Sequence, residues 1–167
     1  MDKKAEIREK ALRDLRGAGV LMAGGHFDFG NGYHGTAYVN PHALLRQPSM
    51  IWRLAQDLLD LLPDALIQEI EVVAGPPTGG ALFAHTLAGL LDSRRSLGHE
   101  PCSFAPFSED ASGLSLREFY RRELKGRRVL IADDVRNTGG TFVRCVELVR
   151  EAGGIPVATV EICDRSE

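Results

Sequence analysis

The sequence predicts an α/β protein in which a central, mostly parallel β-sheet is flanked by helices. The main observation is that short apolar, β-branched runs alternate with helical patterns along the chain, as in βαβ units. In addition, two of the strand-to-helix junctions are rich in glycine. The chain has 167 residues with a hydrophobic share of 44%, which is enough for one core. We therefore expect a single domain over residues 1–167.

The first third of the chain predicts a helix, a hairpin and a second helix. Apolar residues recur on one face of an opening helix that ends at Gly17. Asn31-Gly32 is a hairpin turn signal, so a short strand is expected on either side of it. Ser49 is then expected to cap a helix that stops before Pro63.

The remainder of the chain predicts βα units, whose parallel strands bind ligands at their carboxyl ends. The expected elements are a strand at 70–74, a turn at 75–80, a helix at 81–91, a strand at 103–107, a strand at 129–132, a helix at 142–151 and a strand at 156–162.

Charge and cysteine content exclude several classes of function. The formal net charge of −3 gives no overall attraction to nucleic acid or to an anionic membrane, so any anion site must be local. Cys102, Cys145 and Cys163 form neither a CxxC pair nor a zinc-like grouping, which favours free thiols in a reducing compartment. Neither a signal peptide nor a membrane span is expected, so we predict a cytoplasmic protein.

The run from Val129 to Thr141 is the most informative segment. Four apolar residues suit a strand that is covered on both faces, and Asp133 and Asp134 follow at its carboxyl end. Gly139 and Gly140 then allow close approach of the backbone to an anion at the start of a helix. The carboxylates would be repelled by a phosphate, so they would face sugar hydroxyls or a magnesium ion. The simpler alternative is a polar strand end followed by a helix cap.

This run resembles the signature of the type I phosphoribosyltransferases, which bind 5-phosphoribosyl-1-pyrophosphate (PRPP). The resemblance implies the type I fold, in which the acidic pair holds the ribose hydroxyls as catalytic groups and holds Mg²⁺ indirectly, through those hydroxyls or water. The following loop would bind the 5′-phosphate. The PRPP-binding residues would be Asp133, Asp134, Val135, Arg136, Asn137, Thr138, Gly139, Gly140 and Thr141.

A second loop between a strand and a helix has similar chemistry. Its glycines free the backbone and its prolines stiffen it, so that N–H groups can point at an oxyanion. In the resembled family this position is the pyrophosphate loop, which here would be Gly75, Pro76, Pro77, Thr78, Gly79 and Gly80. A tight βα turn without a chemical role is the alternative.

Two further segments are similar to those of orotate phosphoribosyltransferases. Residues 27–40 resemble their small N-terminal hood, expected over about 20–45 together with the C-terminal end. The run Cys163 to Glu167 resembles the segment after their last strand. The resemblance implies a glycosyltransferase that joins a nucleobase, first of all orotate, to PRPP with release of pyrophosphate in pyrimidine synthesis, working as a homodimer. Base-binding residues would be Tyr38, Val39, Asn137 and Arg165. A planar guanidinium suits the carboxylate of orotate, although a surface arginine is the alternative.

The chain departs from that family at more than one place. Residues 104–114 carry no basic residue where orotate enzymes have a mobile basic loop, and Asn137 stands where a threonine commonly contacts orotate. A basic cluster at 117–128 could supply the charge, or it could be a solvated helix face. A phosphoribosyltransferase for a purine, xanthine or another pyrimidine therefore stays open. So does a PRPP-binding regulatory protein without turnover, with the cluster on RNA, although nucleic acid is not the expected partner.

Overall fold

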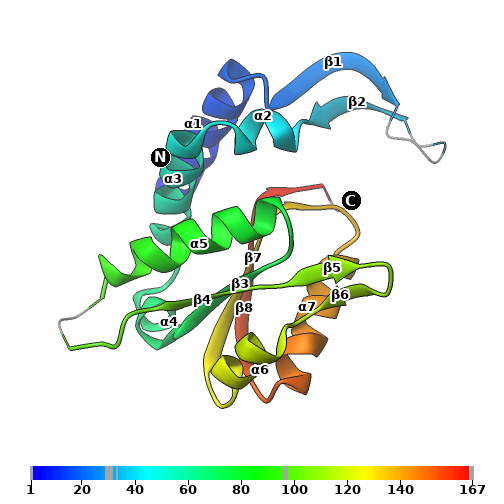
Figure 1. Ribbon diagram of the computed structural model, residues 1–167. Helices are drawn as coiled ribbons and strands as arrows, with labels where there is room; N and C mark the ends of the chain where they lie inside the picture. The colour runs from blue at the N-terminus through cyan, green and yellow to red at the C-terminus, as the bar shows by residue number, and fades with distance from the viewer. Residues whose placement is uncertain (1, 29–31, 33, 96–97, 166–167) are drawn as a thin grey trace. The chain divides into compact units, whose positions relative to one another are not determined.

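The computed structural model describes residues 2–28, 32, 34–95 and 98–165, and it has the α/β class that the sequence predicts (Figure 1). The chain divides into two compact units, Met1–Leu54 and Ala55–Glu167. Among the described residues, no helix is long and apolar enough to cross a membrane.

The N-terminal unit contains the predicted helix and hairpin. Helix α1 (Lys3–Gly17) ends at the expected glycine, and β1 (Leu21–Asp28) pairs antiparallel with β2 (His34–Val39). Of the predicted hairpin turn, Asn31 lies outside the described residues, whereas Gly32 has a positive φ of 77°. A short helix, α2 (Pro41–Leu45), was not predicted; the Asn40 side chain caps it by accepting from two of its N–H groups.

The prediction that Ser49 caps the next helix is wrong. Helix α3 (Pro48–Leu59) begins one residue before Ser49, so Ser49 lies inside its first turn. Proline suits this position because its fixed φ is helical and the first helical N–H needs no partner. The helix ends at Leu59, short of the expected end next to Pro63, and Pro63 precedes an unpredicted helix, α4 (Asp64–Glu69).

The C-terminal unit is built on a four-stranded parallel sheet with strand order β4-β3-β7-β8. Every expected strand and helix of this unit is present, with shifts of up to two residues at the ends, except that the strand expected at 129–132 continues to Arg136. They are β3 (Val72–Gly75), α5 (Gly79–Asp92), β4 (Ser103–Pro106), β7 (Arg128–Arg136), α7 (Gly140–Glu151) and β8 (Ile155–Asp164).

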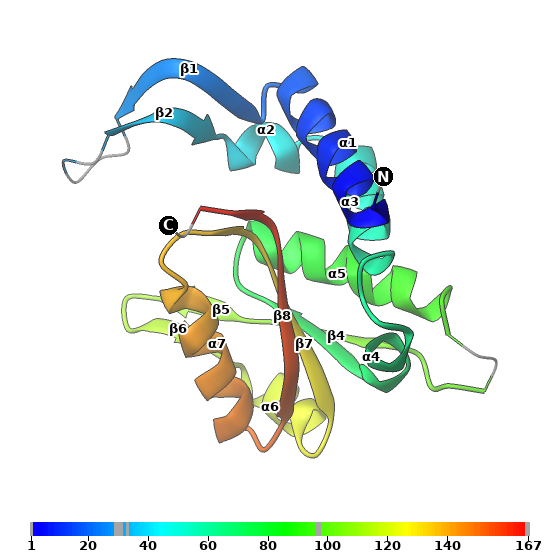
Figure 2. The ribbon, with the colours of Figure 1, turned by 180° about the vertical axis from the view of Figure 1, so that it is seen from behind.

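Helices cover both faces of this sheet, as Figures 1 and 2 show for α5 on one face and α7 on the other. Val129 and Ile131 pack in one apolar cluster with Phe142 and Leu148 of α7. Leu130 is equally buried and points to the opposite face, because side chains alternate along a strand. Coverage on both faces explains why the strand reads as an unbroken apolar run.

The segment between β4 and β7 was expected as a polar stretch, with a solvated helix face as one interpretation of its basic cluster. It forms a small antiparallel hairpin of β5 (Ser108–Asp110) and β6 (Gly113–Ser115), followed by helix α6 (Glu118–Leu124). The Asp110 carboxylate accepts from the backbone N–H of Ser112 at 2.8 Å, which closes the turn. Three-residue strands carry too little alternation to be read from sequence.

The three cysteines are free thiols, as predicted. Cys145 is fully buried under the sheet, and burial raises the pKa of its thiol to about 12. Burial likewise raises the pKa of Cys102 to about 11. Both thiols therefore stay protonated at neutral pH and act as small apolar groups.

Candidate functional site

The acidic pair lies at the carboxyl end of β7, where a fully buried strand becomes accessible. Asp133 is only 7% exposed, and Asp134 is half-buried. The Asp133 carboxylate accepts from the N–H of Asp134, and the Asp134 carboxylate accepts from the N–H of Val135, both at 2.9 Å. These contacts fix both side chains against the backbone before any ligand is present.

The two glycine-rich loops meet at this pair, although more than fifty residues separate them in the sequence. Strands β3 and β7 are neighbours, so their carboxyl ends share one edge of the sheet. A Cβ atom placed on Gly79 would lie 2.0 Å from Oδ2 of Asp134, and one placed on Gly80 would lie 2.6 Å from Oδ1 of Asp133. Only glycine fits at these positions, because any side chain there would displace a carboxylate.

The signature loop, which follows β7, leads into the N-terminus of helix α7. Gly139 adopts a φ of 82°, which favours glycine, and no side chain caps helix α7. The hydroxyl of Thr138 accepts from the N–H of Gly140 at 3.4 Å. The free N–H groups and the helix dipole favour an anion at this end. The geometry at this end of α7 is therefore compatible with an anion next to the carboxylate pair, and the phosphate-binding role of the loop stays a prediction.

Electrostatics distinguish the two carboxylates. Burial raises the pKa of Asp133 to about 7, and interaction with Asp134 and the charge of Glu161 act in the same direction. Near neutral pH, Asp133 is therefore close to half protonated. A cation or an array of hydroxyl donors at the pair would favour the ionised form and lower this pKa.

Strand β8 completes the site with a feature that sequence reasoning missed. Glu161 stands opposite Asp133 in the register, and its carboxylate lies 3.5 Å from the guanidinium of Arg136. The backbone N–H of Arg165 donates to the carbonyl of Arg136 at 2.8 Å, so the C-terminal run lies beside the signature strand. The available signal was a single glutamate in the mainly apolar run from Pro156 to Cys163.

The predicted base-binding residues fall in both units. Tyr38 and Val39 end β2 of the N-terminal unit, where the Tyr38 ring stacks on Phe27 at 5.9 Å between centroids. In the C-terminal unit, Asn137 is exposed at the start of the signature loop and Arg165 follows β8. Their roles toward a base stay predictions.

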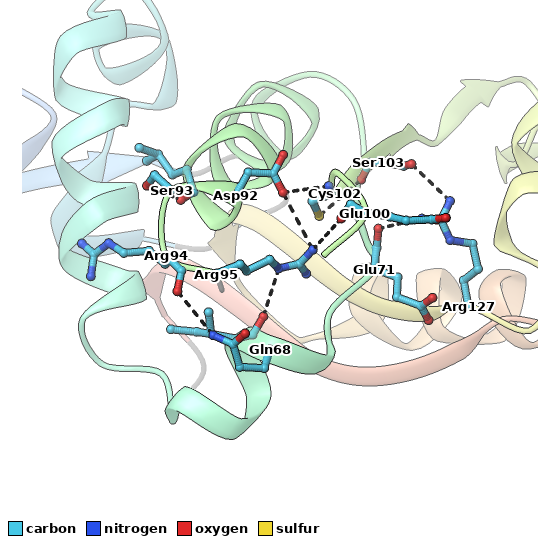
Figure 3. Close-up of polar contacts among 12 residues, drawn as sticks. Gln68, Glu71, Asp92, Ser93, Arg94, Arg95, Glu100, Cys102, Ser103 and Arg127 are labelled. Carbon is cyan, nitrogen blue, oxygen red and sulfur yellow. Dashed lines mark hydrogen bonds and ion pairs between the residues drawn. The ribbon is translucent and has the colours of Figure 1, made fainter. Parts of the chain in front are cut away.

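The basic cluster lies at the other end of the sheet. Arg127 and Arg128 precede or begin β7, and the five steps along the strand from Arg128 to Asp133 span about 17 Å. Figure 3 shows Arg127 bound to Ser103 and Glu71; its guanidinium donates to the Ser103 hydroxyl and to the Glu71 carbonyl, both at 3.1 Å. These two arginines connect the amino ends of the strands and cannot reach the acidic pair of their own chain.

A pocket of about 240 Å³ also lies at these amino ends, lined by residues that include Arg95, Glu100 and Arg127. The Arg95 guanidinium donates to the Ile67 carbonyl at 3.3 Å and lies 3.8 Å from the Asp92 carboxylate (Figure 3). These contacts hold the segment between α5 and β4 against α4. The pocket is therefore remote from the glycine loops and the carboxylate pair.

Comparison with known proteins identifies a matching family model and similar chains. Residues 43–167 match the model of the phosphoribosyl transferase domain. The chain is 35% identical over 159 residues to the orotate phosphoribosyltransferase of Erythrobacter litoralis, covering 95% of this chain and 76% of that protein. It is 32% identical over 160 residues to the orotate phosphoribosyltransferase of Caldicellulosiruptor saccharolyticus, with 95% and 76% covered.

Solved structures agree on the fold and differ in their base. The orotate phosphoribosyltransferase of Aeropyrum pernix superposes with a TM-score of 0.69 at 21% identity, covering 91% of this chain and 92% of that one. The adenine phosphoribosyltransferase of Saccharomyces cerevisiae has a TM-score of 0.66 at 18% identity, covering 93% and 89%. At such identities the structural likeness shows the fold alone. With the family model matching three quarters of the chain and the acidic pair set between two glycine loops, the chain belongs to the phosphoribosyltransferase family.

Proposed function

We propose that the protein is an orotate phosphoribosyltransferase, a glycosyltransferase of pyrimidine nucleotide synthesis that uses PRPP and releases pyrophosphate. The observation that carries the proposal is the packing of Gly79 and Gly80 against Asp134 and Asp133, beside the uncapped end of α7. The identity to orotate enzymes over 95% of the chain supports orotate as the base.

In the proposed reaction, a ring nitrogen of orotate forms a bond to C1 of the ribose as the bond from C1 to the pyrophosphate oxygen breaks, and the nitrogen loses its proton. Positive charge develops on the ribose ring in the transition state. Asp133 and Asp134 would hold the ribose hydroxyls and stabilise that charge. The loop from Val135 to Thr141 would bind the 5′-phosphate through N–H groups and hydroxyls, and the loop from Gly75 to Gly80 would bind pyrophosphate.

Magnesium fits the donor set. Asp133 and Asp134 offer two carboxylates at one strand end, and the described residues contain no group of three or more His, Cys, Asp or Glu side chains that could enclose a metal. Mg²⁺ commonly takes one or two protein carboxylates and completes its shell with water and substrate oxygens. When bound, the ion would neutralise charge on the leaving pyrophosphate. We further propose a cytoplasmic homodimer.

A coupled assay with PRPP, Mg²⁺ and a panel of bases tests the proposal. We expect the rate of orotidine 5′-monophosphate formation from orotate to exceed the rate of nucleotide formation from any other base. A phosphoribosyltransferase for another base is the second candidate, favoured by Asn137 and by the lack of basic residues at 104–114. Preference for adenine or xanthine would support that candidate and reject orotate. PRPP binding without turnover of any base would indicate a regulatory protein.

Gly79→Ala is expected to lower turnover by about a hundredfold, because the new methyl group would push the Asp134 carboxylate off its position. The matched control is Gly89→Ala in the same helix, where nothing lies within 4 Å of the new Cβ. That control should keep full activity and gain up to about 1 kcal/mol of stability. Steady-state rates and thermal melts measure both, and equal activity of the two variants would contradict the packing.

A further inference from the structure

Arg136, the last residue of β7, directs its side chain toward β8. Its Nη1 lies 3.5 Å from Oε1 of Glu161, and its Nε lies 3.6 Å from Oδ1 of Asp164. The Glu161 side chain is 17% exposed and that of Arg136 is 36% exposed, so this ion pair is partly shielded from water. A guanidinium that meets two carboxylates restrains both of them.

The backbone of the same residue holds the next part of the chain. Its carbonyl accepts from the N–H of Arg165 at 2.8 Å, one residue beyond the end of β8. Asp164 and Arg165 are therefore attached to the signature strand twice, once through the Arg136 side chain and once through its main chain.

Charge makes the side-chain attachment necessary. Four carboxylates gather at the ends of β7 and β8, namely those of Asp133, Asp134, Glu161 and Asp164. Glu161 stands opposite Asp133 in the register, and Arg136 stands opposite Asp164. Without the Arg136 guanidinium, Glu161 and Asp164 would repel each other with less compensation, and only backbone contacts would hold the end of β8 against β7.

We propose that Arg136 is a positioning residue that clamps Asp164 and Arg165 to the end of the signature strand, so that the Arg165 guanidinium is presented to the base. The inference rests on the proposed function, since it uses the contact of Arg165 with the base. The signature would then have two separate roles. The backbone of residues 135–141 would bind PRPP, and the Arg136 side chain would position the segment that binds the base.

Steady-state kinetics of Arg136→Met test the clamp. We expect the KM for orotate to rise about tenfold while the KM for PRPP changes less than about twofold, because only the base-binding segment is released. Asp164→Asn should act in the same direction, and the double variant should cost no more than the larger single one, because the two side chains act together. Arg144→Met is the matched control, since Arg144 also pairs with two carboxylates, Glu147 and Glu151, but on α7.

A rise in the KM for PRPP equal to that for orotate would overturn the inference, because the guanidinium would then act on the phosphates. Hydrogen exchange at the Arg165 amide, followed by NMR on the full chain, gives a readout without turnover. Exchange should be faster in Arg136→Met than in the wild type and unchanged in Arg144→Met. Unchanged exchange in Arg136→Met would reject the clamp. A wild-type protein that does not turn over orotate would instead reject the proposed function, and the exchange result would still decide on the clamp.

Discussion

The double variant Asp133→Asn, Asp134→Asn is expected to lose about 10²- to 10³-fold or more in kcat while keeping its fold. Removal of a single preorganised group that stabilises transition-state charge costs about that much, and here both are removed. Asparagine keeps an Oδ1 acceptor, so the contacts to the N–H groups of Asp134 and Val135 can persist. The variant thus removes charge with little change in shape. Initial rates with saturating PRPP and orotate measure the loss.

A matched control removes two carboxylates elsewhere. Glu147→Gln, Glu151→Gln replaces two exposed groups of α7 that pair with Arg144, and such surface pairs contribute little. This control should turn over at the wild-type rate. The interpretation of the acidic pair would be wrong if both double variants lost activity equally, or if the Asp133, Asp134 variant kept more than about a tenth of its rate.

Much of the C-terminal unit could be predicted because its central strands, β3 and β7, are buried on both faces. An unbroken apolar run such as Val129–Ala132, followed by carboxylates and glycines, is compatible with few structures other than a buried parallel strand. The glycines of both loops were also informative, since Gly139 needs its positive φ and Gly79 has no room for a side chain. Local chemistry and local backbone geometry coincide at these positions.

Relations across the sheet could not be predicted in the same way. That Gly79 packs on Asp134 depends on β3 lying next to β7, and periodicity along a chain does not report strand order. The pairing of Arg136 with Glu161 depends on the register of β7 and β8 for the same reason. Ser49 failed as a cap because Pro48 was an equally good helix start, and residue type alone does not decide between neighbouring starts.

Stability should also depend on pH through Asp133, and replacing this residue should stabilise the unliganded protein above neutral pH. The folded-state pKa of Asp133 is about 7, raised from an ordinary value of 3.8 mainly by burial. Between these two values, the unfolded chain has released this proton while the native protein still holds it. The wild type therefore loses stability, relative to Asp133→Asn, as pH rises from about 4 to about 7, and the difference is constant above that range.

Urea unfolding of the two proteins between pH 4 and pH 8 measures this difference, which we expect to reach a few kcal/mol at pH 8, since each pKa unit corresponds to about 1.4 kcal/mol. Glu147→Gln, which removes an exposed carboxylate, should show no such trend. A pH-independent difference, or a wild type more stable than Asp133→Asn at pH 8, would contradict the buried, half-protonated carboxyl. Because the same buried charge is the one proposed to stabilise the ribose cation, the variant that gains stability should be a variant that loses turnover. The site would then hold a carboxylate that the fold alone does not favour, and the positive charge that develops on the ribose ring in the transition state would balance it.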